Sequence, residues 1–212
     1  MNISIAIMSH PDRSKEAESL YNRLSHMQFS SIDLVFDSEN NEWKNGETCL
    51  RKGNDSDWHI IIQDDAIISD NFYENVKNAI LNVPDKSLIS FYTGTVRPMP
   101  HRVKRAVESA ATHAANWLYS DNLFWGVCIA LPREYIEKLL AFTQNRKEVY
   151  DRRIGTYFYI NHLPIYYTNP SLVDHDYTLK SLTGHDYNTE PRKAHQYEPL
   201  IIKNWNNQAI QI

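Results

Sequence analysis

The chain has 212 residues, of which 42% are hydrophobic and 23% charged, and its formal net charge is −4. This composition is ordinary for a folded protein, and the length fits one domain. The two cysteines are too few for a disulfide scaffold, and the negative charge argues against non-specific coating of nucleic acid. No run approaches the roughly 20 apolar residues of a membrane span, and none reads as a signal peptide. We therefore expect a cytoplasmic protein that does not bind membranes.

Short apolar runs alternate with helical patterns in the first part of the chain. Residues 3–8, 32–36, 58–62 and 88–92 are predicted strands, and residues 14–27 and 71–81 are predicted helices. Near-continuous apolar strands separated by helices are typical of a mainly parallel sheet that is covered on both faces. The predicted fold class is therefore α/β, a Rossmann-like sandwich around a mainly parallel central sheet.

The second part of the chain is less regular. We predict a helix over residues 103–118, a strand over 126–131, a helix opened by Pro132, and a strand over 164–168. After Pro170 the sequence becomes polar, and no repeat or linker interrupts it. A single domain is expected.

Two adjacent carboxylates directly follow the third predicted strand, in the segment Gln63-Asp64-Asp65-Ala66. Ligands of open α/β sheets bind outside the carboxyl ends of the strands. One of the two carboxylates can bind a hard cation, which then shares phosphate oxygens, while the other orders the loop or contacts a ribose. A helix cap or a simple turn is the alternative explanation for this pair of acids.

This segment resembles the metal-binding Asp motif of GT-A glycosyltransferases, especially small virus-encoded ones that modify DNA and those related to lipooligosaccharide and collagen sugar transferases. Further tracts are similar to the acceptor-side half of that family, namely residues 125–126, 132–133, 151–155, 168–175 and 181–185. The resemblance extends from residue 3 to about residue 195. It implies one GT-A domain with a nucleotide-sugar half (1–95), an acceptor half (96–195) and a C-terminal tail (196–212). It also implies a UDP-sugar donor and a divalent cation, Mn²⁺ or Mg²⁺.

The resemblance assigns donor-binding roles to residues near the ends of the first three strands. Ser9 and Arg13 would hold the nucleotide, because amides at a helix start and a cationic side chain suit a diphosphate. Asp37 would meet the uracil or ribose, and Arg51 would reach the donor sugar or a phosphate. Asp64 would also bind the sugar nucleotide. The alternative for Ser9 and Arg13 is a plain helix start. The alternative for Asp37 is a solvated acid in a loop, and the alternative for Arg51 is a surface arginine.

Asp65 is the expected metal ligand, and a C-terminal histidine would complete the metal shell. Two candidates, His175 and His185, stand beside carboxylates, which is the usual neighbourhood of a ligating histidine. We favour His185 slightly, since Gly184 permits the close turn of a metal loop. A purely structural histidine is the alternative.

An inverting reaction requires a carboxylate that takes the proton of the acceptor hydroxyl. Asp151, expected to begin a helix that faces the cleft, is the candidate for this catalytic base. The alternative is an N-cap that stabilises its own helix. The retaining and inverting courses both remain open.

A basic stretch stands out on this acidic protein and is a candidate for acceptor binding. It contains Arg97, Arg102, Lys104 and Arg105, and would track a polynucleotide backbone or hold the donor diphosphate. A solvated helix face is the alternative. Trp125 and Gly126 follow it, and the indole ring would stack on a base or a sugar.

Three functions remain at the level of sequence. The first is transfer of a sugar from a UDP-sugar to a hydroxymethylated pyrimidine in phage DNA, which requires the enzyme to reach or flip a base. The second keeps the enzyme class and changes the acceptor to a cell-surface or capsid glycan. The third is a non-catalytic nucleotide- or glycan-binding module. A hydrolytic metalloenzyme is disfavoured, because the sequence has no His-x-x-x-His pair and no second close Asp/Glu pair with the spacing of a nuclease. The oligomeric state is not indicated.

Overall fold

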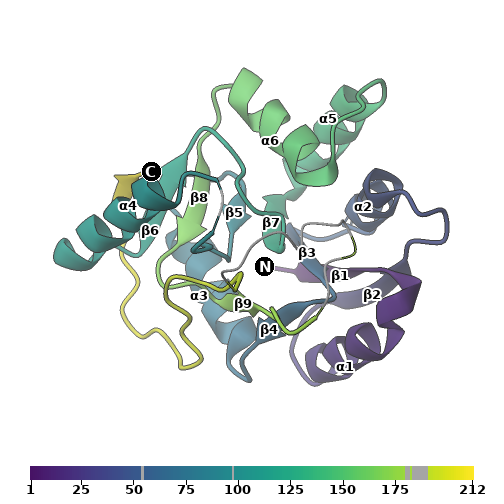
Figure 1. Cartoon of the computed structure of the whole chain (residues 1–212), viewed down its shortest axis with the longest axis horizontal. Coiled ribbons are helices and arrows are strands. Elements are labelled where there is room, and N and C mark those ends of the chain that lie inside the picture. The colour runs from purple at the N-terminus through teal and green to yellow at the C-terminus, as the bar shows by residue number, and fades with distance from the viewer. Residues whose placement is uncertain (54, 97, 180–181, 183–190) are drawn as a thin grey trace.

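The computed structural model describes residues 1–53, 55–96, 98–179, 182 and 191–212. Within these residues an eight-stranded sheet has the order β10-β6-β8-β5-β7-β3-β1-β2 (Figure 1). Its strands are β1 (Ile3–Ser9), β2 (Ser31–Phe36), β3 (Trp58–Gln63), β5 (Ile89–Ser90), β6 (Trp117–Ser120), β7 (Cys128–Pro132), β8 (Ile165–Thr168) and β10 (Ala209–Gln211). Four neighbouring pairs are parallel, whereas β7 is antiparallel to both β3 and β5, and β6 is antiparallel to β8. The predicted α/β sandwich with a mainly parallel sheet is confirmed.

Helices cover both faces of this sheet, as the continuous burial of β1 requires. Ile3, Ile5 and Ile7 of β1 share one hydrophobic cluster with α1 (Ser14–Ser25) and α3 (Phe72–Asn82). Ala6 and Met8 point to the opposite face, because successive side chains of a strand alternate. That face is covered by α2 (Glu42–Arg51), α4 (Pro100–Thr112), α5 (Arg133–Thr143) and α6 (Tyr150–Ile160). The carboxyl ends of β1 and β3 therefore meet at an edge between the two helical layers.

The predicted helix over residues 103–118 is wrong in its second half. Helix α4 ends at Thr112, Ala114 has a positive φ of 52°, and the chain then enters β6 at Trp117. The Ala115 amide donates to the carbonyl of Ala110, a typical closure of a helix end. Trp117 and Leu118 thus belong to the sheet rather than to the helix, because a buried strand and a buried helix look alike over a short run.

Two further elements differ from the prediction. The fourth predicted strand is reduced to the two residues of β5, although residues 88–94 are all buried. Helix α2 was not predicted. It begins after Asn41, whose side chain accepts a hydrogen bond from the Lys44 amide at 3.1 Å.

The C-terminal part of the chain contributes an edge strand to the main sheet and one strand of a separate ribbon. β10, within the segment expected to be a tail, pairs with β6. Separately, β4 (Ala66–Ile68) and β9 (Val173–His175) form a two-stranded antiparallel ribbon beside the main sheet. No helix in the described part of the chain has both the length and the apolar character of a membrane span.

Candidate active site

A cleft of about 870 Å³ opens where β1 and β3 end, and it gathers many of the predicted site residues. Those that line it are Ser9, Arg13, Asp37, Asp64, Asp65, Trp125, Gly126, Asp151 and His175. They come from both halves of the chain, so the fold creates a shared site from segments that are distant in sequence.

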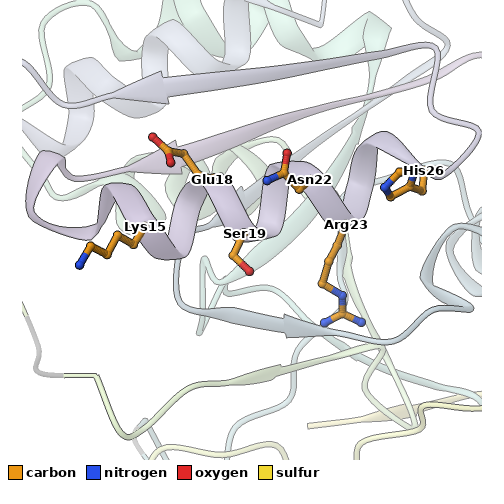
Figure 2. Close-up of a pocket in the computed structure, with 6 residues that line it drawn as sticks. All are labelled: Lys15, Glu18, Ser19, Asn22, Arg23 and His26. Carbon is orange, nitrogen blue, oxygen red and sulfur yellow. The ribbon is translucent and has the colours of Figure 1, made fainter.

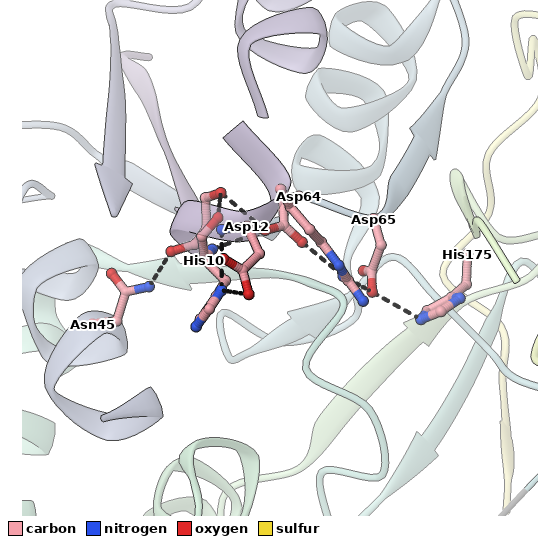
Figure 3. A network of polar contacts seen from close by, with 8 residues as sticks. His10, Asp12, Asn45, Asp64, Asp65 and His175 are labelled. Carbon is pink, nitrogen blue, oxygen red and sulfur yellow. Dashed lines mark hydrogen bonds and ion pairs between the residues drawn. The ribbon is translucent and has the colours of Figure 1, made fainter. Parts of the chain in front are cut away.

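Asp64 ties the end of β3 to the end of β1 (Figure 3). Its Oδ2 accepts hydrogen bonds from the Ser9 hydroxyl at 2.9 Å and from the His10 amide at 3.0 Å. Its Oδ1 accepts from Arg13 Nη1 at 2.9 Å. Burial raises the pKa of Asp64, and the His10 hydrogen bond opposes that rise only in part. The amide and the guanidinium that were expected to hold a diphosphate are thus engaged by this carboxylate.

Asp65 is buried next to it and shares the same arginine. Its Oδ2 accepts from Arg13 Nη1 at 2.6 Å and lies 3.2 Å from His175 Nε2. Burial by itself raises the pKa of Asp65, but the hydrogen bonds and charges of His175 and Arg13 outweigh it and lower the pKa to about 2. Asp65 Oδ1 is buried and has no hydrogen-bond partner among the described residues. One oxygen of this carboxylate is therefore held, and the other is left for a ligand.

The ribbon of β4 and β9 explains why His175 reaches Asp65. Its register places His175 opposite Ala66, the residue after Asp65, and the Asp176 amide donates to the Asp65 carbonyl at 2.8 Å. His185, the other predicted ligand, lies outside the described residues. Among the residues that are described, no group of three or more His, Cys, Asp or Glu side chains is arranged to hold a metal ion. Asp65 and His175 form a pair.

The cleft is lined by two more carboxylates, Glu42 and Asp151, at the first turns of α2 and α6. The buried ring of Tyr150 brings these turns together, since it packs against Gly46 and Gly126. A Cβ at these glycines would lie 2.3 Å and 2.9 Å from the ring, so only glycine allows the approach. Burial, followed by the charges of Asp151 and Asp37, raises the pKa of Glu42.

Asp151 does not cap its helix. The N-cap position of α6 is Val149, which makes no side-chain cap, and Asp151 lies inside the first turn. The N-cap alternative is therefore wrong. Its position in the cleft is the one expected for a catalytic base, although that role stays a prediction.

Other predicted residues are not brought to the cleft. Arg51 pairs with Glu47 at 2.6 Å near the end of α2, outside the lining residues. Arg102, Lys104 and Arg105 are exposed on α4 and are also outside the lining. The buried side of α4 consists of apolar residues, so its basic side chains form the solvated face that was the alternative. Arg97 lies outside the described residues.

Several lining residues were missed by the sequence reasoning. They include Glu42, Asn45, Tyr92 and Arg192. Only Glu42 carried a usable signal, because Asn41 before it is a favourable N-cap and marks a helix start. The others reach the cleft through strand order and loop packing, which leave no mark in the local sequence.

The charge of the lining is strongly negative. Among the described residues, the lining contains two arginines, Arg13 and Arg192, and six carboxylates: Asp12, Asp37, Glu42, Asp64, Asp65 and Asp151. A bound diphosphate would be repelled by this excess unless a cation came with it.

A second, shallower hollow of about 460 Å³ lies along α1 (Figure 2). Its lining residues, such as Lys15, Glu18 and Arg23, all come from that helix or its C-cap. In the described part of the chain, no other element contributes a side chain that converges on it. We therefore take the cleft at the ends of β1 and β3 as the candidate active site.

Comparisons with known proteins add little to this geometry. No protein-family model matches the sequence, and no curated protein matches it. One similar solved structure is a glycosyltransferase involved in the glycosylation of the major capsid of PBCV-1, with 12% identity, 68% of each chain covered and a TM-score of 0.41. Another is mannose-1-phosphate geranyltransferase from Thermus thermophilus, with 9% identity, 79% of this chain and 74% of that chain covered, and a TM-score of 0.42. At these values neither structure assigns an activity to this chain.

Proposed function

We propose that this chain is a GT-A glycosyltransferase that depends on a divalent cation and transfers a sugar from a UDP-sugar to an acceptor hydroxyl. The observation that carries the proposal is the acidic pair at the end of β3, with His175 brought to 3.2 Å from Asp65. This position, outside the carboxyl end of a strand in an open α/β sheet, is where such folds bind ligands.

The residues fit a divalent cation. Carboxylate oxygens and an imidazole nitrogen suit Mn²⁺, and carboxylate oxygens suit Mg²⁺. The free Oδ1 of Asp65 is a ligand atom that the described residues leave unused. Asp65 and His175 would hold the cation, which when bound supplies positive charge to the departing diphosphate.

The remaining residues would act on the donor and the acceptor. Asp37 and Asp64 would face the nucleoside, and Ser9 holds Asp64 in its orientation. Asp151 would accept the proton of the acceptor hydroxyl at its carboxylate, if the reaction inverts. Trp125 would offer an aromatic face to the acceptor, with Gly126 beside it.

The described lining favours a glycan acceptor over a modified base in DNA. Six carboxylates against two arginines would repel a phosphodiester chain, and the basic residues of α4 lie outside the lining. The DNA acceptor remains a prediction from the basic stretch. A gel shift with hydroxymethylated DNA at two salt concentrations tests it, because phosphate contacts make binding steeply salt-dependent.

The test of the proposed function is a thermal shift with UDP and Mn²⁺, alone and together, followed by assays of UDP release with a panel of UDP-sugars. A glycosyltransferase of this kind shows a larger shift with both ligands than the two separate shifts combined. Equal stabilisation by UDP with and without Mn²⁺, together with no turnover of any donor, would favour the non-catalytic binding module instead.

A further inference from the structure

Arg13 occupies the space between the two adjacent carboxylates. It ends the short 3-10 helix η1 (Pro11–Arg13), and its Nη1 lies 2.9 Å from Asp64 Oδ1 and 2.6 Å from Asp65 Oδ2. The arginine side chain and both acids are nearly buried, with 10%, 6% and 8% of their side-chain surfaces exposed. One guanidinium therefore bridges the two carboxylates and offsets one of their two negative charges in the protein without ligands.

This arrangement conflicts with a cation at the same atoms. Asp65 Oδ2 already faces both Arg13 Nη1 and His175 Nε2. A divalent cation bonded to carboxylate oxygens sits about 2.0–2.2 Å from them. Two positive groups cannot share these buried oxygens at such distances without strong repulsion. Arg13 must therefore move before Asp65 and His175 can hold a cation together.

Moving Arg13 has a cost that depends on what else is bound. The movement breaks the buried ion pairs of Arg13 with Asp64 and Asp65, and breaking a buried ion pair is strongly unfavourable. A diphosphate in the cleft removes this cost, since its oxygens accept hydrogen bonds from a guanidinium in a bidentate manner. Asp64 stays oriented meanwhile, because Ser9 and the His10 amide hold its Oδ2 independently of Arg13.

We propose that Arg13 is a displaceable internal counter-ion that competes with the divalent cation for Asp65, and that the donor diphosphate takes up the released guanidinium. The inference rests on the proposed function, and it identifies Arg13 as the residue that couples the two ligands. Cation alone then binds weakly, and cation with nucleotide binds well, because each ligand removes an obstacle to the other.

The experiment measures binding of Mn²⁺ by electron paramagnetic resonance of the free ion, with and without UDP, in the chain of 212 residues. In the wild type we expect weak binding of Mn²⁺ alone and much tighter binding when UDP is present. In Arg13→Gln, Mn²⁺ alone should bind about tenfold more tightly than in the wild type, and the gain from UDP should shrink.

Two further variants make the test specific. Arg23→Gln removes an exposed arginine that pairs with Asp70 at 3.1 Å, and it should leave both affinities unchanged. Arg13→Lys keeps a positive charge between the carboxylates, so the binding of Mn²⁺ alone should remain weak in this variant. This variant tests the inference even if Arg13→Gln fails to fold. Circular dichroism checks the fold of each variant.

The outcomes separate this inference from the proposed function. If UDP strengthens Mn²⁺ binding in the wild type, but a folded Arg13→Gln binds Mn²⁺ alone no more tightly, the counter-ion role is wrong and the proposed function stands. Tight binding of Mn²⁺ alone by Arg13→Lys would also refute the role. If the wild type binds no Mn²⁺ even with UDP, the cation-dependent function itself fails, and this inference fails with it.

Discussion

His175 Nε2 lies 3.2 Å from Asp65 Oδ2, a contact that joins the last strand of the β4–β9 ribbon to the end of β3. Two residues predicted to bind the metal, Asp65 and His175, are therefore already in contact in the described structure. Replacing His175 with Ala should lower the affinity for Mn²⁺ in the presence of UDP by about tenfold, and activity should recover in part at higher Mn²⁺. Titration of activity against Mn²⁺ checks this, with the exposed His113→Ala as control. An unchanged Mn²⁺ dependence would remove His175 from the site.

Asp65→Asn should reduce sugar transfer by at least about 100-fold, because the variant loses the negative charge that holds a cation. The substitution keeps the shape of the side chain, so the melting temperature should change little compared with the loss of rate. The measurement is turnover alongside a thermal melt. Asp70→Asn is the matched control, since Asp70 is almost fully exposed. A variant that turns over normally and still needs the metal would show that the ligand lies elsewhere.

Asp151→Asn should slow transfer by about 10²–10⁴-fold while UDP affinity in Mn²⁺ is preserved, because a missing general base affects proton transfer and not donor binding. Single-turnover rates and calorimetric UDP binding separate these effects. Asp121→Asn, an exposed acid outside the cleft lining, should match the wild type. Weakened UDP binding would move Asp151 to the donor side of the cleft.

Glu42→Gln should stabilise the protein at neutral pH. The pKa of Glu42 is raised by burial and by Asp151, so its ionised form costs free energy in the folded state. Glutamine removes that cost above the folded pKa, and makes no difference below about pH 4.5, where glutamate is protonated in both states. The melting temperature should rise by about 2 °C at pH 7.5 and stay level at pH 4. Exposed Glu137→Gln should show no such pH dependence, and a fall at pH 7.5 would contradict the prediction.

His59 should make the fold sensitive to acid. Burial lowers its pKa from 6.5 to about 4, against the hydrogen bond to the Cys49 carbonyl, and its other ring nitrogen bonds to Ser4 at 2.7 Å. Because the unfolded chain takes up this proton more readily, stability is full above pH 6.5 and declines as the pH falls towards 4. The loss should reach about 3 kcal/mol. Urea unfolding at several pH values measures it, and His59→Gln should lack this component. Parallel pH profiles for the two proteins would refute the assignment.

The sequence could predict the layered fold because the signal for it is local. The apolar run of residues 3–8 can only be buried on both faces, which requires helices on either side of a sheet. The same reasoning fails where the run is short. Trp117 and Leu118 continue the apolar pattern of α4, yet they lie in β6, because the choice between helix and strand there depends on the neighbours β8 and β10.

The candidate site could be predicted only in part, because some of its residues follow a local pattern and others are brought in by contacts between distant segments. Asp64 and Asp65 follow a recognisable strand, so their place at the sheet edge is readable. The basic residues of α4 also look functional in sequence, but the helix turns them to solvent and its apolar side to the core. The sequence alone does not distinguish a charge that lines a cleft from a charge on the exposed face of a helix.

By itself, the sequence determined that the chain forms an α/β sheet with two acids at the end of an inner strand. Hydrophobic periodicity is a property of a few consecutive residues, so it can be read from the sequence without knowing which other segments pack against them. The tertiary structure alone decided that Arg13 lies between these acids, that His175 contacts Asp65, and that Glu42 and Asp151 line the same cleft. Those relationships depend on strand order, on the register of β4 with β9 and on the close packing of Tyr150 against glycines. They are contacts between distant segments, and only the folded chain brings such segments together.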